Sequence, residues 1–200
     1  MKLIVISNPI SFKGEELIVN QLFEEGMEIY HLRKENASIA EYRKYIEGID
    51  AQYHHQIALH QHHELAKVYG INRLHYSESF RRKQTVKLAN TVRSTSVHQL
   101  QSIDEIVEFN YAFFSPVFNS LSKPGYNGVI NEDFRLDNPH HQLEIIALGG
   151  ISIDNIMQIA KMGFNGAAVL GTIWNDPSNA VNTFKMLQRE VRNLQVSLEK

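Results

Sequence analysis

The sequence lacks several features that would assign it to a specialised class. It contains no cysteine, which excludes a disulfide scaffold and a zinc site built on thiolates. No run approaches the roughly 18 apolar residues of a membrane-spanning helix. The 20 basic and 22 acidic residues leave a net charge of −2, which gives no electrostatic case for nucleic acid. The apolar start of the chain is too short for a signal peptide, so we expect a soluble, cytoplasmic protein.

The composition that remains is that of an ordinary globular domain. Apolar residues make up 43% of the chain and charged residues 21%. Two hundred residues are enough for one domain with a sizeable core. There is no linker or low-complexity tract, and we therefore expect residues 1–200 to form a single domain.

Apolar, β-type runs alternate with amphipathic stretches along the whole chain. A helical spacing is seen over 14–26, over 38–49 after a capping Ser38, over 63–70 up to Gly70, and over 100–109, 154–162 and 178–192. Strict alternation implies a parallel sheet with right-handed crossovers, and eight units favour a closed (β/α)8 TIM barrel. An open, doubly wound sheet is the alternative. The eight predicted strands are 3–7, 27–33, 56–60, 73–77, 92–98, 111–118, 143–150 and 166–172.

In a barrel of this kind the active site lies at the carboxyl ends of the strands. Gly149 and Gly150 follow the seventh predicted strand, and Gly171 lies in the eighth predicted run. Glycines leave backbone N–H groups accessible, and the helices that follow favour anions at their N-termini. This pair of turns predicts a phosphate site. The alternative is that the glycines only make tight turns.

Two other windows carry cationic or hydroxyl side chains. The loop after the sixth predicted strand reads SPVFNSLSKPGYNG, and its Ser120, Ser122 and Lys123 suit an anionic substrate. A solvated lysine loop is the simpler interpretation of that segment. Arg33 ends the second strand, where its planar guanidinium could bind a phosphate or form a buried salt bridge.

Histidines gather at the ends of neighbouring predicted strands. His60 and His62 could share a strand face, and His31 and His75 end the strands on either side. Three converging imidazoles would suit Zn²⁺ or another transition metal. The alternative is that no metal binds, with His62 and His63 in the exposed first turn of a helix.

The order of HLR, SVH, SPVFNSLSK, IIALGGI and GAAVLGTI resembles the thiamine-phosphate synthase/TenI superfamily over about residues 3 to 175. The resemblance implies a small phosphate-binding barrel that acts in thiamine biosynthesis. It implies transfer of a pyrimidinylmethyl group from hydroxymethylpyrimidine pyrophosphate to a thiazole phosphate, with release of pyrophosphate and with Mg²⁺ as cofactor. The implied partners are the phosphorylated thiazole and pyrimidine substrates, and a homo-oligomer is left open.

The resemblance also implies roles for individual residues. Arg33, Ser96 and Lys123 would bind pyrophosphate, and the glycines at 149, 150 and 171 would bind the thiazole phosphate. The positions that match the family motifs are Arg33, Ser96, His98, Pro116, Lys123, Gly149 and Gly150, with Ser120 and Ser122 where the family has threonine. Gly171, followed by Thr172, stands where the family often has serine.

Several positions depart from the family pattern. His31 stands where the family has glutamine, and Glu35 stands in a lysine position. The two family positions for magnesium aspartates hold Gln61 and Phe80, so neither supplies a charged oxygen. Glu78 could substitute from two positions away.

These departures keep three functions open. The first is a thiamine-phosphate synthase-like transferase with Arg33, Lys123, His31 and His98 as its catalytic candidates. The second is a TenI-like thiazole tautomerase with His31 or His98 as the base, although TenI typically has its catalytic histidine where this chain has Pro116. The third is a catalytically silent homologue that binds thiazole phosphate.

Overall fold

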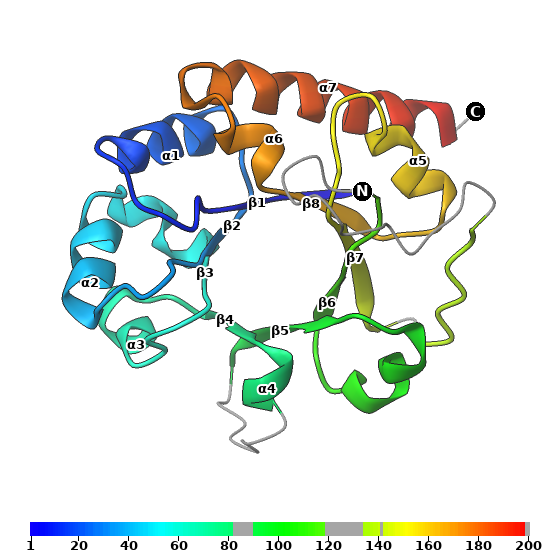
Figure 1. Cartoon of the computed structure of the whole chain (residues 1–200), viewed down its shortest axis with the longest axis horizontal. Helices are drawn as coiled ribbons and strands as arrows, with labels where there is room; N and C mark the ends of the chain where they lie inside the picture. The colour runs from blue at the N-terminus through cyan, green and yellow to red at the C-terminus, as the bar shows by residue number, and fades with distance from the viewer. Residues whose placement is uncertain (82–89, 119–133, 141, 199–200) are drawn as a thin grey trace.

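Eight parallel strands close into a barrel in the computed structural model, which describes residues 1–81, 90–118, 134–140 and 142–198 (Figure 1). Each strand pairs with its neighbours in chain order, and β8 pairs with β1. The (β/α)8 barrel expected from the alternation is therefore confirmed, and the open sheet is excluded. The strands are β1 Lys2–Ile6, β2 Ile29–Leu32, β3 Ile57–Leu59, β4 Arg73–Tyr76, β5 Val92–Val97, β6 Tyr111–Phe114, β7 Glu144–Leu148 and β8 Gly166–Val169.

Helices surround the barrel and carry the terminal signals expected of them. Ser38 caps α2, since its hydroxyl accepts from the Glu41 N–H while the Glu41 carboxylate accepts from Ser38 N. Gly70, with φ 67°, ends α3 in the left-handed conformation. The α-helices are α1 Glu15–Glu24, α2 Ile39–Glu47, α3 Leu65–Tyr69, α4 Glu78–Arg81, α5 Ile156–Lys161, α6 Gly171–Trp174 and α7 Ala180–Leu198, and the 3-10 turns are η1 Ala51–Gln56, η2 Leu100–Ile106 and η3 Pro177–Asn179.

Some predicted elements differ in kind or length. The segment 100–109 forms the 3-10 turn η2 rather than an α-helix, and its buried Ile103 and Ile106 are three residues apart, one 3-10 repeat. The eighth strand ends at Val169, because Gly171 already begins α6. Of the fourth helix the structure describes Glu78–Arg81. That residues 1–200 form a single domain stays a prediction.

Two apolar clusters fill the fold. The larger one lies between the strands and the surrounding helices. The smaller one lies inside the barrel and comes mainly from β1, β6, β7 and β8, while β2, β4 and β5 contribute the buried side chains of His31, His75 and Ser94. One half of the interior is therefore apolar and the other polar. The interior apolar residues are Ile4, Ile6, Ile29, Tyr111, Phe113, Ile146 and Ala168.

The seam between β8 and β1 brings the two ends of the sheet together. Lys2 to Val5 pair with Gly166 to Val169. A side chain at Gly166 would begin 2.7 Å from the Lys2 carbonyl oxygen, so glycine permits this close approach. The indole N–H of buried Trp174 donates to the Ile6 carbonyl at 2.6 Å and ties α6 to the end of β1. None of the helices in the described part of the chain is long and apolar enough to span a membrane.

Candidate functional site

Arg33 lies just past the end of β2, at the mouth where the strands end. Its backbone N–H donates to the Ser7 hydroxyl at 2.9 Å, and that hydroxyl donates to the Arg33 carbonyl at 2.6 Å. The exposed guanidinium forms no hydrogen bond or ion pair with any described residue. The backbone is thus fixed while the charge remains available to an anion from solution.

Lys34, next along the chain, points to the other side of the strand. Its ammonium is buried and contacts both oxygens of Glu15 at 2.6 Å and the Asn8 carbonyl at 2.8 Å. Burial lowers the pKa of Lys34, and the hydrogen bond and charge of Glu15 oppose that shift. The Lys34 ammonium is therefore not available to a ligand at the mouth of the barrel.

A chain of hydrogen bonds runs through His31 inside the barrel. His31 Nε2 pairs with the Tyr111 hydroxyl at 2.7 Å, and His31 Nδ1 pairs with His60 Nε2 at 2.8 Å. Both nitrogens of the fully buried His31 are therefore occupied, whereas His60, at the end of β3, is partly exposed. His60 Nδ1 forms no hydrogen bond within the described part of the chain. A ligand at the mouth would meet His60 rather than His31.

The positions of the hydrogens along the hydrogen bonds from Tyr111 through His31 to His60 depend on one another. Each contact holds one proton, so two neutral arrangements exist. In one, the hydrogens point from Tyr111 toward His60, and His60 Nδ1 carries a hydrogen. In the other they point back, the Tyr111 hydroxyl oxygen accepts from His31 Nε2, and His60 Nδ1 presents a lone pair. His60 can therefore act as donor or acceptor without either ring becoming charged.

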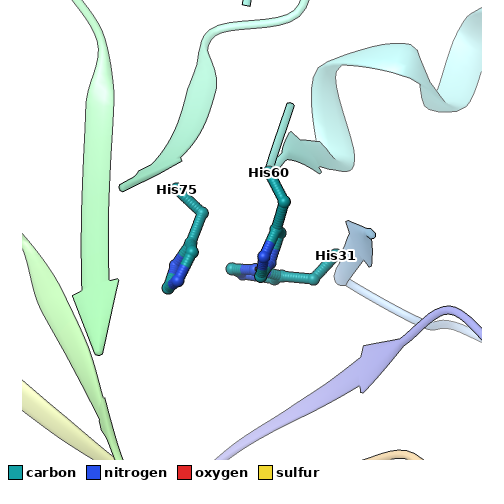
Figure 2. Close-up of side chains that lie close together, drawn as sticks. All are labelled: His31, His60 and His75. Carbon is teal, nitrogen blue, oxygen red and sulfur yellow. The ribbon is translucent and has the colours of Figure 1, made fainter. Parts of the chain in front are cut away.

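His75 is held on its edge and on both faces. Its Nδ1 pairs with the Ser94 hydroxyl at 2.9 Å and its Nε2 with the Ser96 hydroxyl at 3.2 Å. Its ring stacks on His60 with centroids 4.0 Å apart, and on Phe113 at 5.3 Å. Ser96, expected to bind pyrophosphate, thus already contacts His75. The three histidine side chains lie together in Figure 2.

The histidine cluster is neutral near pH 7. Burial lowers the pKa of His31 and of His60 well below the ordinary 6.5, and neighbouring His75 adds to both shifts. Burial, with smaller contributions from His63 and Arg33, lowers the pKa of His75 to about 3. Neutral imidazoles keep one lone pair each, and they add no positive charge to the barrel interior.

His98, the other predicted base, lies apart from the three interior histidines, past the end of β5. Its side chain is exposed, and its Nδ1–H donates to the Ser115 carbonyl at 2.8 Å. That bond fixes the tautomer and leaves Nε2 as the acceptor. The arrangement suits proton transfer at the mouth, while the role itself stays a prediction.

The glycines after β7 and β8 are not equivalent. Gly149 has φ 102°, and a side chain there would begin 3.1 Å from Pro116 Cα, so backbone conformation and close packing both favour glycine. Gly150 also has a positive φ, at 66°. At Gly171 the nearest atom, on Asn175, would be 3.5 Å away, which leaves ordinary space. Only Gly171 is left unexplained by packing or a positive φ.

Thr172 has a structural partner as well. Its hydroxyl donates to the Ile151 carbonyl and joins the turns after β7 and β8. Of the predicted phosphate-binding residues, Ser120, Ser122 and Lys123 lie outside the described residues.

The residues at the two positions of the family's magnesium aspartates, Gln61 and Phe80, both contact other side chains or the backbone of the protein. Gln61 accepts from the Tyr42 hydroxyl and donates to the Lys34 carbonyl at 3.2 Å. Phe80 packs its ring against Tyr76 and His63. Mg²⁺ requires oxygen ligands in octahedral geometry, and neither of these positions supplies a charged oxygen. The donor set at these positions does not fit Mg²⁺.

The remaining metal candidates also have other contacts. Glu78 lies 3.9 Å from the Arg81 guanidinium. His62 and His63 are partly buried rather than exposed in a helical turn, which corrects that expectation: His62 has φ 53° and donates to the Ala37 carbonyl, and His63 donates to the Leu59 carbonyl, each at 3.0 Å. His62 therefore does not join His31, and β3 ends too early for it to share a face with His60.

Sequence reasoning did not identify Tyr111 and Ser94, which hold His31 and His75. Period-two alternation carries a usable signal for both. Ser94 lies two residues before the predicted Ser96, and Tyr111 lies two before the interior Phe113.

Comparison with known proteins gives a consistent result. The family model described as thiamine monophosphate synthase matches residues 3–173. A thiamine-phosphate synthase of Leuconostoc citreum is 24% identical over 170 residues, which is 78% of this chain and 79% of that protein. A thiamine phosphate pyrophosphorylase from Bacteroides thetaiotaomicron superposes with a TM-score of 0.80 and 28% identity, covering 96% of this chain and 98% of the other. One from Pyrococcus furiosus gives a TM-score of 0.78 at 18% identity, with 96% of each chain covered, and shows the fold alone.

Proposed function

The chain belongs to the thiamine monophosphate synthase family, and from that premise we propose that it couples hydroxymethylpyrimidine pyrophosphate to a thiazole phosphate. In this reaction the carbon–oxygen bond to pyrophosphate breaks, a carbon–nitrogen bond to the thiazole ring forms, and pyrophosphate leaves. Positioning two rings and neutralising the leaving group are the main demands on the protein.

The single observation that carries this proposal, beside the family match, is the exposed Arg33 guanidinium. It lies at the mouth on a fixed backbone and has no described partner. A planar guanidinium can bind two phosphate oxygens at once and so stabilise the charge that develops on leaving pyrophosphate. Lys123 and Ser96 are proposed to bind the same pyrophosphate group.

The turns after β7 and β8 are proposed to bind the thiazole phosphate. Gly171 begins α6 with space around its Cα, and Gly149 and Gly150 shape the facing turn. Backbone N–H groups at such turns suit an anion. We propose no step that uses Mg²⁺, because Gln61 and Phe80 replace the family's carboxylates.

The test is pyrophosphate release and thiamine phosphate formation from both substrates, measured with Mg²⁺, with Zn²⁺ and with EDTA. Arg33→Ala is expected to lower kcat/KM about 100-fold or more, since it removes charge stabilisation at the leaving group. Arg43→Ala is the matched control, because Arg43 is an exposed arginine of α2 that contacts Tyr69. Its rate should stay within about twofold of the unmodified protein, consistent with a surface contact of little worth.

Other outcomes separate the alternatives. Equal rates in Arg33→Ala and Arg43→Ala would remove Arg33 from the mechanism. Calorimetric binding of thiazole phosphate by a protein that gives no turnover would instead identify a silent homologue.

A second candidate, interconversion of thiazole phosphate isomers, is favoured by the chain from Tyr111 through His31 to His60. Its end at the partly exposed His60 could take a proton from a ligand and return it. Isomerisation that is lost in His60→Gln and kept in His98→Gln would support it. Because His31 has both nitrogens occupied, we propose His60 rather than His31 as the group in contact with substrate.

A further inference from the structure

Three imidazoles from neighbouring strands converge inside the barrel. His31 lies on β2, His60 directly follows β3 and His75 lies on β4. One nitrogen of each lies within 4.8 Å of the other two, and Figure 2 shows the side chains reaching toward a common point. These are the only three residues in the described part of the chain that gather as possible metal ligands.

The donor atoms have the chemistry that a borderline metal ion prefers. The rings are neutral near pH 7, so a metal ion does not have to displace excess protons. No carboxylate takes part, and the chain has no thiolate. Three imidazoles with a fourth position open are a recurrent zinc arrangement, whereas Mg²⁺ and Ca²⁺ require oxygen ligands.

Hydroxyl groups surround two of the three rings as outer partners. The Tyr111 hydroxyl holds Nε2 of His31, which leaves Nδ1 directed at His60 Nε2. Ser94 holds Nδ1 of His75 from the neighbouring strand. Partners on the far nitrogen of a histidine fix its tautomer and orientation for metal binding.

From this convergence we propose that His31, His60 and His75 bind one divalent transition-metal ion of the Zn²⁺ class. The fourth position would face the mouth beside the partly exposed His60, where water or a phosphate oxygen can enter. Arg33 lies on the same side and would favour an anion there. Metal binding at these histidines does not depend on the proposed transferase activity.

The rings must rearrange to accept the ion. At Zn–N distances of 2.0 to 2.1 Å, tetrahedral ligand atoms lie about 3.4 Å apart. His31 Nδ1 and His60 Nε2 are 2.8 Å apart and share one proton, so they separate slightly when the ion takes its place. The ion must also lie in the plane of each ring, while His60 and His75 are stacked with an interplanar angle of 21°. His75 therefore turns out of its stack and gives up its longer contact, 3.2 Å to Ser96.

The test is a calorimetric titration of EDTA-treated, tag-free protein with Zn²⁺ at pH 7.5, with metal content measured after dialysis. We expect one ion per chain. Loss of an outer partner commonly costs 10- to 100-fold in metal affinity, so removal of a ligand in His60→Ala should cost about 100-fold or more. His63→Ala is the matched control, since His63 is close in sequence, partly buried and outside the three. Its affinity should be unchanged.

A second measurement needs no variant, so it tests the proposal even if His60→Ala fails to fold. Cobalt in place of zinc should give visible absorption typical of tetrahedral coordination. In ¹⁵N-histidine spectra, the signals of His31, His60 and His75 should shift on metal addition, and those of the other histidines should not. The proposal is overturned if no ion binds stoichiometrically. It is equally overturned if His60→Ala and His63→Ala lose affinity alike, which would indicate binding by scattered surface histidines. Substrate turnover is measured separately, so its absence would leave this result intact.

Discussion

Two buried polar clusters lie on opposite sides of the chain at β2. On the helix side, Lys34 and Glu15 form a charged pair in which the ammonium has three oxygen contacts. On the barrel side, His31 belongs to a neutral cluster with His60 and His75. Residues only three apart in sequence therefore serve different purposes. The ion pair has all its partners within the protein, whereas the histidine cluster ends at His60 Nδ1, which has no hydrogen-bond partner among the described residues.

The difference concerns what each cluster can exchange with its surroundings. A buried ion pair is strongly destabilised when one partner is lost, because the other charge stays behind in a medium of low polarity. A neutral imidazole cluster can gain a proton or a metal ion with only local rearrangement. His31 on β2 and Lys34 just after it thus separate a binding function from a stabilising function.

The largest effect is expected from Lys34→Met, which leaves the Glu15 carboxylate buried without its cation. We expect a loss of about 3–5 kcal/mol in the free energy of unfolding, measured by urea denaturation. The double variant Glu15→Gln/Lys34→Met should recover part of that loss, because no unpaired charge remains. A double variant that is no more stable than Lys34→Met would contradict the charged assignment of this pair.

A smaller loss in the free energy of unfolding is expected when the pH is lowered, because the buried histidines must then take up protons. In the unfolded chain His75 binds a proton below about pH 6.5, whereas in the folded protein it does so only near pH 3. Stability is therefore retained above pH 6.5 and falls as the pH drops toward 3, by about 2 kcal/mol at pH 5 for this residue alone. Urea denaturation between pH 8 and pH 5, with EDTA present, measures the slope.

His75→Phe is the control for this acid effect, since an aromatic ring can keep the stack on His60 and Phe113. The variant should show a flatter dependence of stability on pH. An unchanged slope would mean that His75 is already protonated in the folded protein.

The smallest effect is expected from Tyr111→Phe, which removes one hydroxyl from the neutral cluster. Loss of a single hydrogen bond between neutral groups should cost about 1 kcal/mol. The ¹⁵N shifts of both His31 and His60 should change, because their tautomers are linked to that hydroxyl. Tyr53→Phe is the control, since the Tyr53 hydroxyl bonds to no described residue. Shifts confined to His31 would show that the two rings are not coupled.

The architecture could be predicted because each strand carries its own apolar run and each helix its own spacing. Ser38 and Gly70 signal helix ends through local chemistry alone. Lys34, two residues past the end of β2, turns away from the barrel mouth and is buried. Its partner Glu15 was not foreseen, because that contact depends on where α1 packs against the barrel.

The sequence predicted only which short segments, at the carboxyl ends of the strands, would form the site. The contact between Tyr111 and His31 joins residues 80 positions apart, and it follows from the registers of strands that are not adjacent. Gly149 illustrates the same point, since the close packing that favours glycine there comes from Pro116 on another loop. Neither the contact between Tyr111 and His31 nor that between Gly149 and Pro116 can be read from the spacing of residues along the sequence.

Trp174, whose indole bonds to Ile6 across the seam of the barrel, has a practical consequence for following how the chain folds. It is the only tryptophan in the sequence. Its emission should therefore report when α6, which follows the last strand, meets the end of the first strand, a contact between residues 168 positions apart. Such a distant contact forms late in most folding reactions, because the closure of a long loop must precede it. Tryptophan fluorescence can thus be used to follow the closing of the barrel without an added label.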